Sequence, residues 1–109
     1  MVDGLHAVLA KLDREYELRY TKYYIGLERA GVVNNFMQFR PKQNFLKLTF
    51  TSEASPELEK AMDDAGLDVM GYEQKWHEYT VRVTPKDFQT HSTLLADIIK
   101  RAYESANAD

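Results

Sequence analysis

The chain has 109 residues, of which 44% are hydrophobic and 28% charged, with three prolines and no cysteine. This profile is typical of one globular domain that folds without disulfides, and it excludes a disordered chain, a collagen-like repeat and a disulfide-stapled miniprotein. The formal charge of −3 is uneven, because residues 1 to 50 carry +3 and residues 51 to 109 carry −6. No apolar run long enough for a membrane span and no signal peptide occur, so we expect a cytoplasmic protein with no membrane contact.

The first half of the chain predicts one helix and three strands. Apolar residues at three-and-four spacing indicate a helix over residues 4 to 16, with Asp3 as its N-cap. Aromatic and β-branched residues then favour three strands, near residues 20 to 28, 33 to 40 and 44 to 51. A turn is expected at Ala30-Gly31, since glycine tolerates positive φ.

The second half predicts a helix, a hairpin and a last helix. Ser55 and Pro56 have the form of a helix start, and Gly66 of a helix end. Two strands follow near residues 67 to 73 and 78 to 83, joined by a hairpin connection. Thr84 is expected to cap the last helix, whose apolar stripe consists of Phe88, His91, Leu95, Ile98, Ile99 and Ala102.

The order of these elements is α-β-β-β-α-β-β-α. Hairpin-linked strands separated by helices predict a two-layer α+β fold with a five-stranded antiparallel or mixed sheet and helices on one face. No linker or internal repeat interrupts the pattern. We therefore expect a single domain over residues 1 to 109.

No arrangement of residues points firmly to catalysis. His6, His77 and His91 lie on separate predicted elements, so neither a metal site nor another cofactor is expected. Glu73 and Lys75, with an upstream aspartate such as Asp63, Asp64 or Asp68, match the pattern of a metal-dependent nuclease. Nine Glu and eight Lys make that triplet easy to meet by chance. Nuclease activity is therefore the third hypothesis, and no catalytic residue is assigned.

A basic and aromatic stretch covers residues 19 to 47. It carries one acid, Glu28, and six cations, Arg19, Lys22, Arg29, Arg40, Lys42 and Lys47. Cations neutralise phosphates and exposed rings stack on bases, as in proteins that bind single strands on a sheet face. An ordinary sheet explains the same residues, since half of the rings in alternating strands face a core. We expect Phe36, Gln38, Arg40, Phe45 and Lys47 at the centre of this surface.

Trp76 lies at the predicted hairpin tip. Such a ring usually packs against its own hairpin, whereas an exposed tryptophan marks an interface. Trp76 is thus a candidate protein contact.

Two stretches resemble a known family. They run from Tyr20-Thr21-Lys22-Tyr23-Tyr24-Ile25-Gly26-Leu27 through Asn34-Asn35-Phe36 to Phe39-Arg40-Pro41-Lys42, and from Ala65-Gly66-Leu67-Asp68 to Trp76, Tyr79 and Thr84. Over residues 20 to 103 the chain resembles an uncharacterised bacterial and archaeal domain family of unknown function. That family is often the C-terminal module of predicted restriction-endonuclease-like, ATPase-like or "predicted transport" proteins. The resemblance implies an accessory module of a larger bacterial protein and supplies no catalytic residue.

The sequence thus predicts a non-enzymatic binding or interaction domain. The expected ligand-binding residues are Lys22, Asn34, Asn35, Arg40 and Lys42. A protein partner or a covalently attached domain is the first expectation. The alternative is nucleic acid or another polyanion, held on the basic aromatic sheet face. The oligomeric state stays open.

Overall fold

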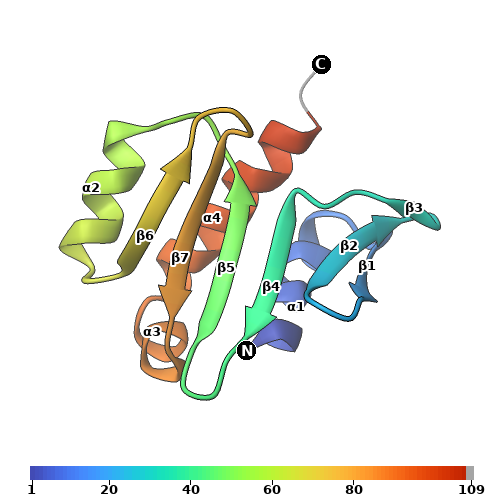
Figure 1. Ribbon diagram of the computed structural model, residues 1–109, viewed down its shortest axis with the longest axis horizontal. Helices are drawn as coiled ribbons and strands as arrows, with labels where there is room; N and C mark the ends of the chain where they lie inside the picture. The colour runs from blue at the N-terminus through green and yellow to red at the C-terminus, as the bar shows by residue number, and fades with distance from the viewer. Residues whose placement is uncertain (108–109) are drawn as a thin grey trace.

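The structure is a computed structural model that describes residues 1–107, in which one helix, five strands, one helix, two strands and two helices follow one another (Figure 1). In chain order they are α1 (Val2–Leu12), β1 (Tyr16–Tyr20), β2 (Ile25–Arg29), β3 (Val32–Val33), β4 (Met37–Pro41), β5 (Leu46–Thr51), α2 (Pro56–Asp64), β6 (Asp68–Glu73), β7 (Glu78–Val83), α3 (Pro85–Thr90) and α4 (Ser92–Ala106).

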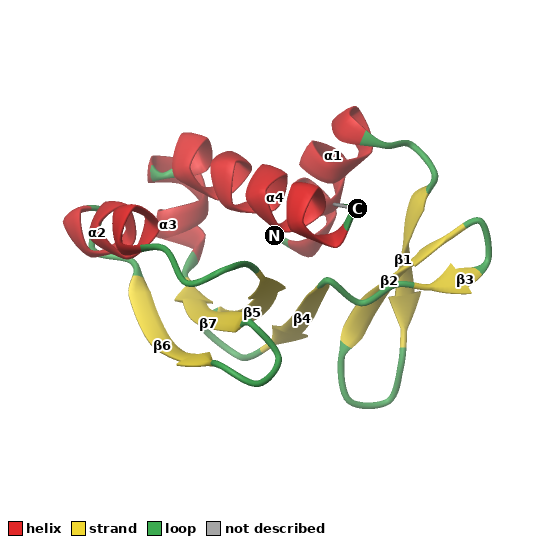
Figure 2. Cartoon of the chain, turned by 90° about the horizontal axis from the view of Figure 1, so that it is seen from above, coloured by secondary structure: helices red, strands yellow, loops and turns green. Residues whose placement is uncertain are grey.

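The strands form one open sheet in the order β1-β2-β4-β5-β7-β6, with antiparallel neighbours and with β3 paired to β2. Strands β2 and β4 meet at a single residue pair, Ile25 opposite Phe39. Figure 2 shows the result: β1, β2 and β3 form a wing that turns away from the four-stranded part. The helices α1 to α4 all lie on one side of the sheet (Figure 2).

The core lies between the helices and the side of the sheet that faces them. Alternate residues of β7 are buried, as a half-buried strand requires, and β4 and β5 bury the same face. Helix α4 contributes a buried stripe of Leu95, Ile98, Ile99 and Ala102, and α1 contributes Leu5 and Leu9. Burial of such apolar side chains stabilises a fold by about 1.5–3 kcal/mol each. The helices are therefore held on one face, and none of the helices within residues 1–107 lies on the opposite face.

The predicted fold class and several local signals are confirmed. The chain is α+β, with an open antiparallel sheet and one-sided helices. Ser55 Oγ accepts a hydrogen bond from Leu58 N at 3.1 Å, with Pro56 as the first residue of α2. Thr84 and Asp87 form a capping box at α3, with distances of 3.0 and 3.1 Å. The strands predicted near 67 to 73 and 78 to 83 match β6 and β7.

The predicted number of strands was wrong, because the sheet has seven strands instead of five. The strand expected over residues 20 to 28 is in fact the β1–β2 hairpin. Thr21 closes its turn, because its Oγ1 accepts from Tyr24 N and donates to Tyr24 O. The strand expected over residues 33 to 40 is divided into β3 and β4.

Both terminal helices also differ from the prediction. Helix α1 ends at Leu12, since Asp13 Oδ1 accepts from Glu15 N in a turn, and Tyr16 begins a strand. Its N-cap is Met1, without a side-chain hydrogen bond, so Asp3 is not the cap. The last helix is divided at His91, whose φ of −117° and ψ of 36° are not helical. Apolar spacing does not reveal one residue of non-helical backbone, so the sequence predicted one helix there.

Candidate binding face

The side of strands β4, β5, β7 and β6 that faces away from the helices is called the open face here (Figure 2). Alternation of side chains across each strand decides which residues lie on it. Phe39, Leu48 and Val81 are buried toward the helices. Their sequence neighbours on the open face are mostly polar or charged, so this face is a polar surface with no helix above it.

Three cations lie side by side across the open face. Arg40 on β4 is opposite Lys47 on β5, and Lys47 is opposite Arg82 on β7. We call Arg40, Lys47 and Arg82 the basic row. Asp68 on the edge strand β6 is opposite Arg82, with its Oδ2 at 3.5 Å from Arg82 Nε. That Nε is buried without a hydrogen bond. Within residues 1–107 Arg82 is therefore the one cation of the row with a carboxylate near it.

Two aromatic rings support the ends of the basic row. The guanidinium carbon of Arg40 lies 5.5 Å from the ring centre of Tyr24, and that of Arg82 lies 4.4 Å from the ring centre of Phe45. Cations at such distances are attracted by the negative face of the ring. Gln38 Oε1 also accepts a hydrogen bond from Arg40 at 3.1 Å. The rings and Gln38 therefore hold the two guanidinium groups in place on the sheet.

Tyr24 keeps its position because of Gly26 and Asn35. Asn35 Oδ1 accepts from Leu27 N at 3.0 Å, and its Nδ2 donates to the Tyr24 hydroxyl at 3.2 Å. A Cβ atom on Gly26 would overlap Asn35 Oδ1 and approach the Tyr24 ring. The glycine thus leaves the space in which Asn35 and Tyr24 lie beside Arg40.

The next row on the open face is neutral. Gln38, Thr49 and Thr80 lie in register on β4, β5 and β7, and the two threonine hydroxyls are 3.2 Å apart. Gly71 on β6 is opposite Thr80 and adds no side chain. A shallow hollow of about 320 Å³ forms there, lined on its sides by Lys47 and Glu73.

Two acids follow at the other end of the face. Glu78 on β7 lies opposite Glu73 on β6, and we call them the acidic pair. Glu73 Oε1 accepts from Lys75 N at 2.9 Å. Along β7 the charge on the open face therefore changes from basic at Arg82, through neutral, to acidic at Glu78, while β6 carries an acid at both ends, Asp68 and Glu73.

The structure unites some of the sequence-predicted site residues and separates others. Asn35 and Arg40 meet through Tyr24, as described above. Lys22 and Lys42 are exposed in turns at the same end of the sheet as Arg40, because the start of β2 lies beside the end of β4. Asn34 instead donates to the Tyr16 hydroxyl at 3.0 Å, so its side chain joins the segment after β3 to the start of β1.

Phe36 does not lie on the open face. It is 4% exposed, with its ring centre 5.2 Å from that of Tyr16 in an edge-on contact. Residues 34 to 36 are inserted between β3 and β4, and this insertion breaks the alternation on which the expectation rested. Trp76 is 63% exposed at the β6–β7 turn, and Lys75 Nζ lies 5.1 Å from its ring centre.

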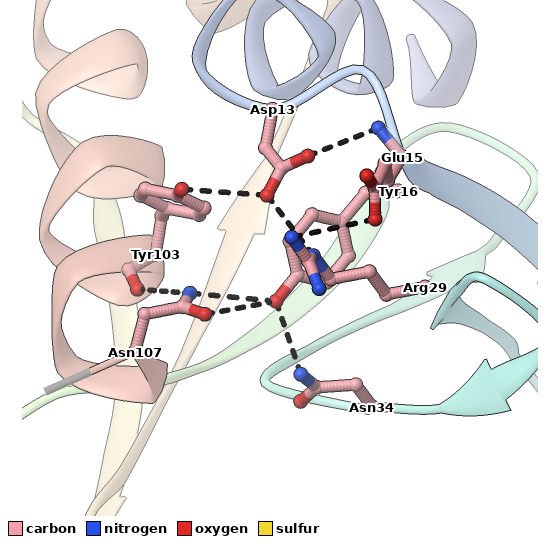
Figure 3. A network of polar contacts seen from close by, with 7 residues as sticks. All are labelled: Asp13, Glu15, Tyr16, Arg29, Asn34, Tyr103 and Asn107. Atoms are coloured by element: carbon pink, nitrogen blue, oxygen red, sulfur yellow. Dashed lines mark hydrogen bonds and ion pairs between the residues drawn. The ribbon is translucent and has the colours of Figure 1, made fainter. Parts of the chain in front are cut away.

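A second polar cluster joins the wing to the helices (Figure 3). Asp13, 13% exposed, accepts from Arg29 Nε at 3.1 Å and from the Tyr103 hydroxyl at 3.4 Å. The Glu15 backbone N–H, together with the Arg29 guanidinium, lowers the pKa of Asp13, and burial raises the pKa of Tyr103. The buried Tyr16 hydroxyl contacts both Asn34 and Asn107. Each group here has its partner within the chain, so the cluster is a structural one.

Glu73 and Lys75, the residues of the nuclease hypothesis, make separate contacts within the β6–β7 turn. Glu73 binds the Lys75 backbone, while the Lys75 ammonium lies over Trp76. Among the described residues, no three His, Asp or Glu side chains gather as a metal site would require. In residues 1–107 no helix combines the length and apolar character needed to cross a membrane.

Comparisons with known proteins found no family model, curated protein or solved structure that matches the chain significantly. The resemblance to the bacterial and archaeal domain family therefore stays an expectation. The site is defined by its geometry alone: a basic row with two supporting rings, on a sheet face without helices.

Proposed function

We propose that this chain is a non-enzymatic binding domain that holds a negatively charged partner on its open face. The observation that carries the proposal is the basic row, in which three cations from three adjacent strands lie in register. Like charges opposite each other on neighbouring strands destabilise a sheet. An anionic partner removes that repulsion, so its binding is favoured at this row.

The row also sets the size of the partner. It crosses three strands, which are spaced about 4.8 Å apart, and is therefore roughly 10 Å long. A ligand with two or more anionic groups reaches all three cations, whereas a single small anion reaches fewer. Attachment to a larger protein and work in the reducing cytoplasm are part of the same proposal, and the absence of cysteine is compatible with them.

Single-stranded nucleic acid is the second candidate, and the aromatic rings favour it. Tyr24 and Phe45 lie beside the basic row, where bases could reach them when phosphates meet the cations. Stacking of a base on an aromatic ring contributes about 1–3 kcal/mol. Replacement of Tyr24 by leucine should then weaken binding of single-stranded DNA more than binding of an acidic peptide, because both lose the support of Arg40 and only the DNA also loses a stacking ring.

Fluorescence anisotropy tests the proposal with two labelled probes, a single-stranded DNA of about 20 nucleotides and a polyglutamate peptide. If three phosphates are neutralised, affinity for single-stranded DNA should fall roughly 20-fold between about 50 and 200 mM salt. Arg40→Ala combined with Lys47→Ala should weaken binding and reduce this dependence to roughly threefold, since one cation is left. The matched control is Lys60→Ala with Lys100→Ala, which removes two exposed cations from the helices.

An affinity that does not change with salt concentration contradicts the proposal. So does binding that is kept in the Arg40 and Lys47 double variant but lost in the control variant. A third result also contradicts the proposal. It is a wild-type chain that binds neither probe and also fails to bind the carboxylate-bearing partner tested in the next subsection.

A further inference from the structure

The open face carries two groups of like charge that the fold leaves without opposite partners. Arg40 lies opposite Lys47, and Glu73 lies opposite Glu78. Within residues 1–107 none of these four side chains takes part in an ion pair. Each group destabilises the isolated sheet, because like charges on neighbouring strands repel.

The two groups stand at a defined spacing. Arg82, in the basic row, and Glu78, in the acidic pair, are four residues apart on β7, or roughly 14 Å along the strand. The neutral row of Thr49 and Thr80 lies between them. A polyanion would satisfy the basic row and be repelled by the acidic pair. The face therefore fits a partner that carries an acidic group opposite the basic row and a basic group opposite the acidic pair, with the same spacing between them.

We propose that this partner is a second copy of the chain, docked open face to open face. The inference rests on the proposed function, since the acidic pair of the second copy is then the anionic group held by the basic row. The required symmetry is a twofold axis between the two faces that runs across the strands through the neutral rows. Rotation about this axis reverses the strand direction, so each basic row meets an acidic pair.

Such an arrangement repeats each contact twice, as an isologous twofold contact must. Arg82 of each copy faces Glu78 of the other with Lys47 one strand away, while Asp68 of each copy faces Glu73 of the other, a repulsive contact that further weakens the dimer. The threonines of the neutral rows are short side chains, which suits sheets packed about 10 Å apart. Four strands of five or six residues give a face of about 20 by 20 Å, so the two copies cover about 800 Å² together. That area is below the size of a stable interface, and the dimer should be weak and sensitive to salt.

Charge reversal tests the inference by sedimentation velocity at about 10 to 500 μM protein and low salt. Lys47→Glu and Glu78→Lys should each lower the association constant about tenfold or more, since the first turns two attractive contacts into repulsive ones and the second turns four. Both positions lie beside like charges in their own chain, so each variant should keep or raise the thermal midpoint. That second readout shows that lost association does not come from unfolding. Lys100→Glu, an equal charge change on α4, is the control and should associate like the wild type.

The decisive sample is an equimolar mixture of Lys47→Glu and Glu78→Lys. In a mixed pair the two reversed residues face each other with opposite charges, and at the symmetric contact Lys47 still faces Glu78. Two monomeric variants should therefore associate together, more weakly than the wild type because Arg82 of one chain then faces the lysine at position 78 of the other. A wild-type chain that is monomeric at about 500 μM overturns the inference, as do variants that associate normally or a mixture that stays monomeric.

The anisotropy assay separates failure of the dimer from failure of the binding face. A monomeric chain that binds DNA or polyglutamate through Arg40 and Lys47 overturns the dimer and leaves the proposed function standing. Single-stranded DNA bound more tightly by Glu78→Lys, with no association in the mixture, identifies nucleic acid as the partner instead. A chain that neither associates nor binds an anionic probe overturns both proposals.

Discussion

Gly26 gives the sharpest test of how the side chains beside the basic row are held. Its missing side chain leaves room for Asn35, which binds Leu27 N and the Tyr24 hydroxyl at 3.0 and 3.2 Å. In Gly26→Ala the new Cβ overlaps Asn35 Oδ1, so the amide must leave this position. The variant then loses both hydrogen bonds, and Tyr24 loses its support beside Arg40.

The size of the effect follows from the groups left without partners. Leu27 is fully buried, and an unsatisfied buried N–H costs about 1–3 kcal/mol. The bond to the partly exposed Tyr24 hydroxyl adds about 0.5–1 kcal/mol. Gly26→Ala should therefore lower the free energy of unfolding by about 2–3 kcal/mol, or the thermal midpoint by about 10 °C.

A double-mutant cycle in urea separates this mechanism from a general intolerance of alanine. Asn35→Ala alone removes the same two hydrogen bonds and should cost about as much. In the Asn35→Ala background the Gly26→Ala change should cost little, because the displaced group is already gone. Additive losses, near 5 kcal/mol for the double variant, would refute the argument, as would an unchanged midpoint in Gly26→Ala.

Two further predictions concern titratable groups with shifted pKa values. Asp13 has a pKa below its ordinary 3.8, so its contribution is present above that pH and is lost as the pH falls through the lower folded-state value. Asp13→Asn should be less stable than the wild type at pH 7, and urea unfolding near pH 2.5 should show a smaller difference; an equal deficit at both pH values would contradict this. Tyr79 is buried, donates to Glu59 at 2.9 Å and accepts from Ser55 N at 2.9 Å. Burial raises its pKa above 10, so its contribution is present below pH 10 and is lost as the pH rises through the folded-state value. Tyr79→Phe should lower the free energy of unfolding by about 1–2 kcal/mol at pH 7. Above pH 10 the stability of this variant should fall less steeply with pH than that of the wild type, and thermal unfolding at pH 7 and above pH 10 checks both expectations.

Part of the open face was predicted from the sequence. Alternation correctly assigned Gln38, Arg40 and Lys47 to one side of the β4–β5 hairpin. Arg82 was not among the expected binding residues, because it lies outside the basic stretch of residues 19 to 47. Its alternation with Val81 and Val83 was the one signal that could have indicated it. Of the acidic pair only Glu73 was considered, as part of a nuclease motif, since charge on one strand does not show what lies on the next.

The sequence by itself determined the features that depend on near neighbours. The caps at Ser55 and Thr84 and the alternation in β5 and β7 arise from hydrogen bonds and side-chain directions within a few residues, and each was confirmed. Tertiary structure decided the features that depend on register between distant strands. Pairing of β5 with β7 brings Arg82 beside Lys47, 35 positions away in the chain. The three residues between β3 and β4 turn Phe36 into the core and place Asn35 under Tyr24. These contacts are set by how the whole sheet buries its apolar side against the helices, and a local pattern does not contain that information.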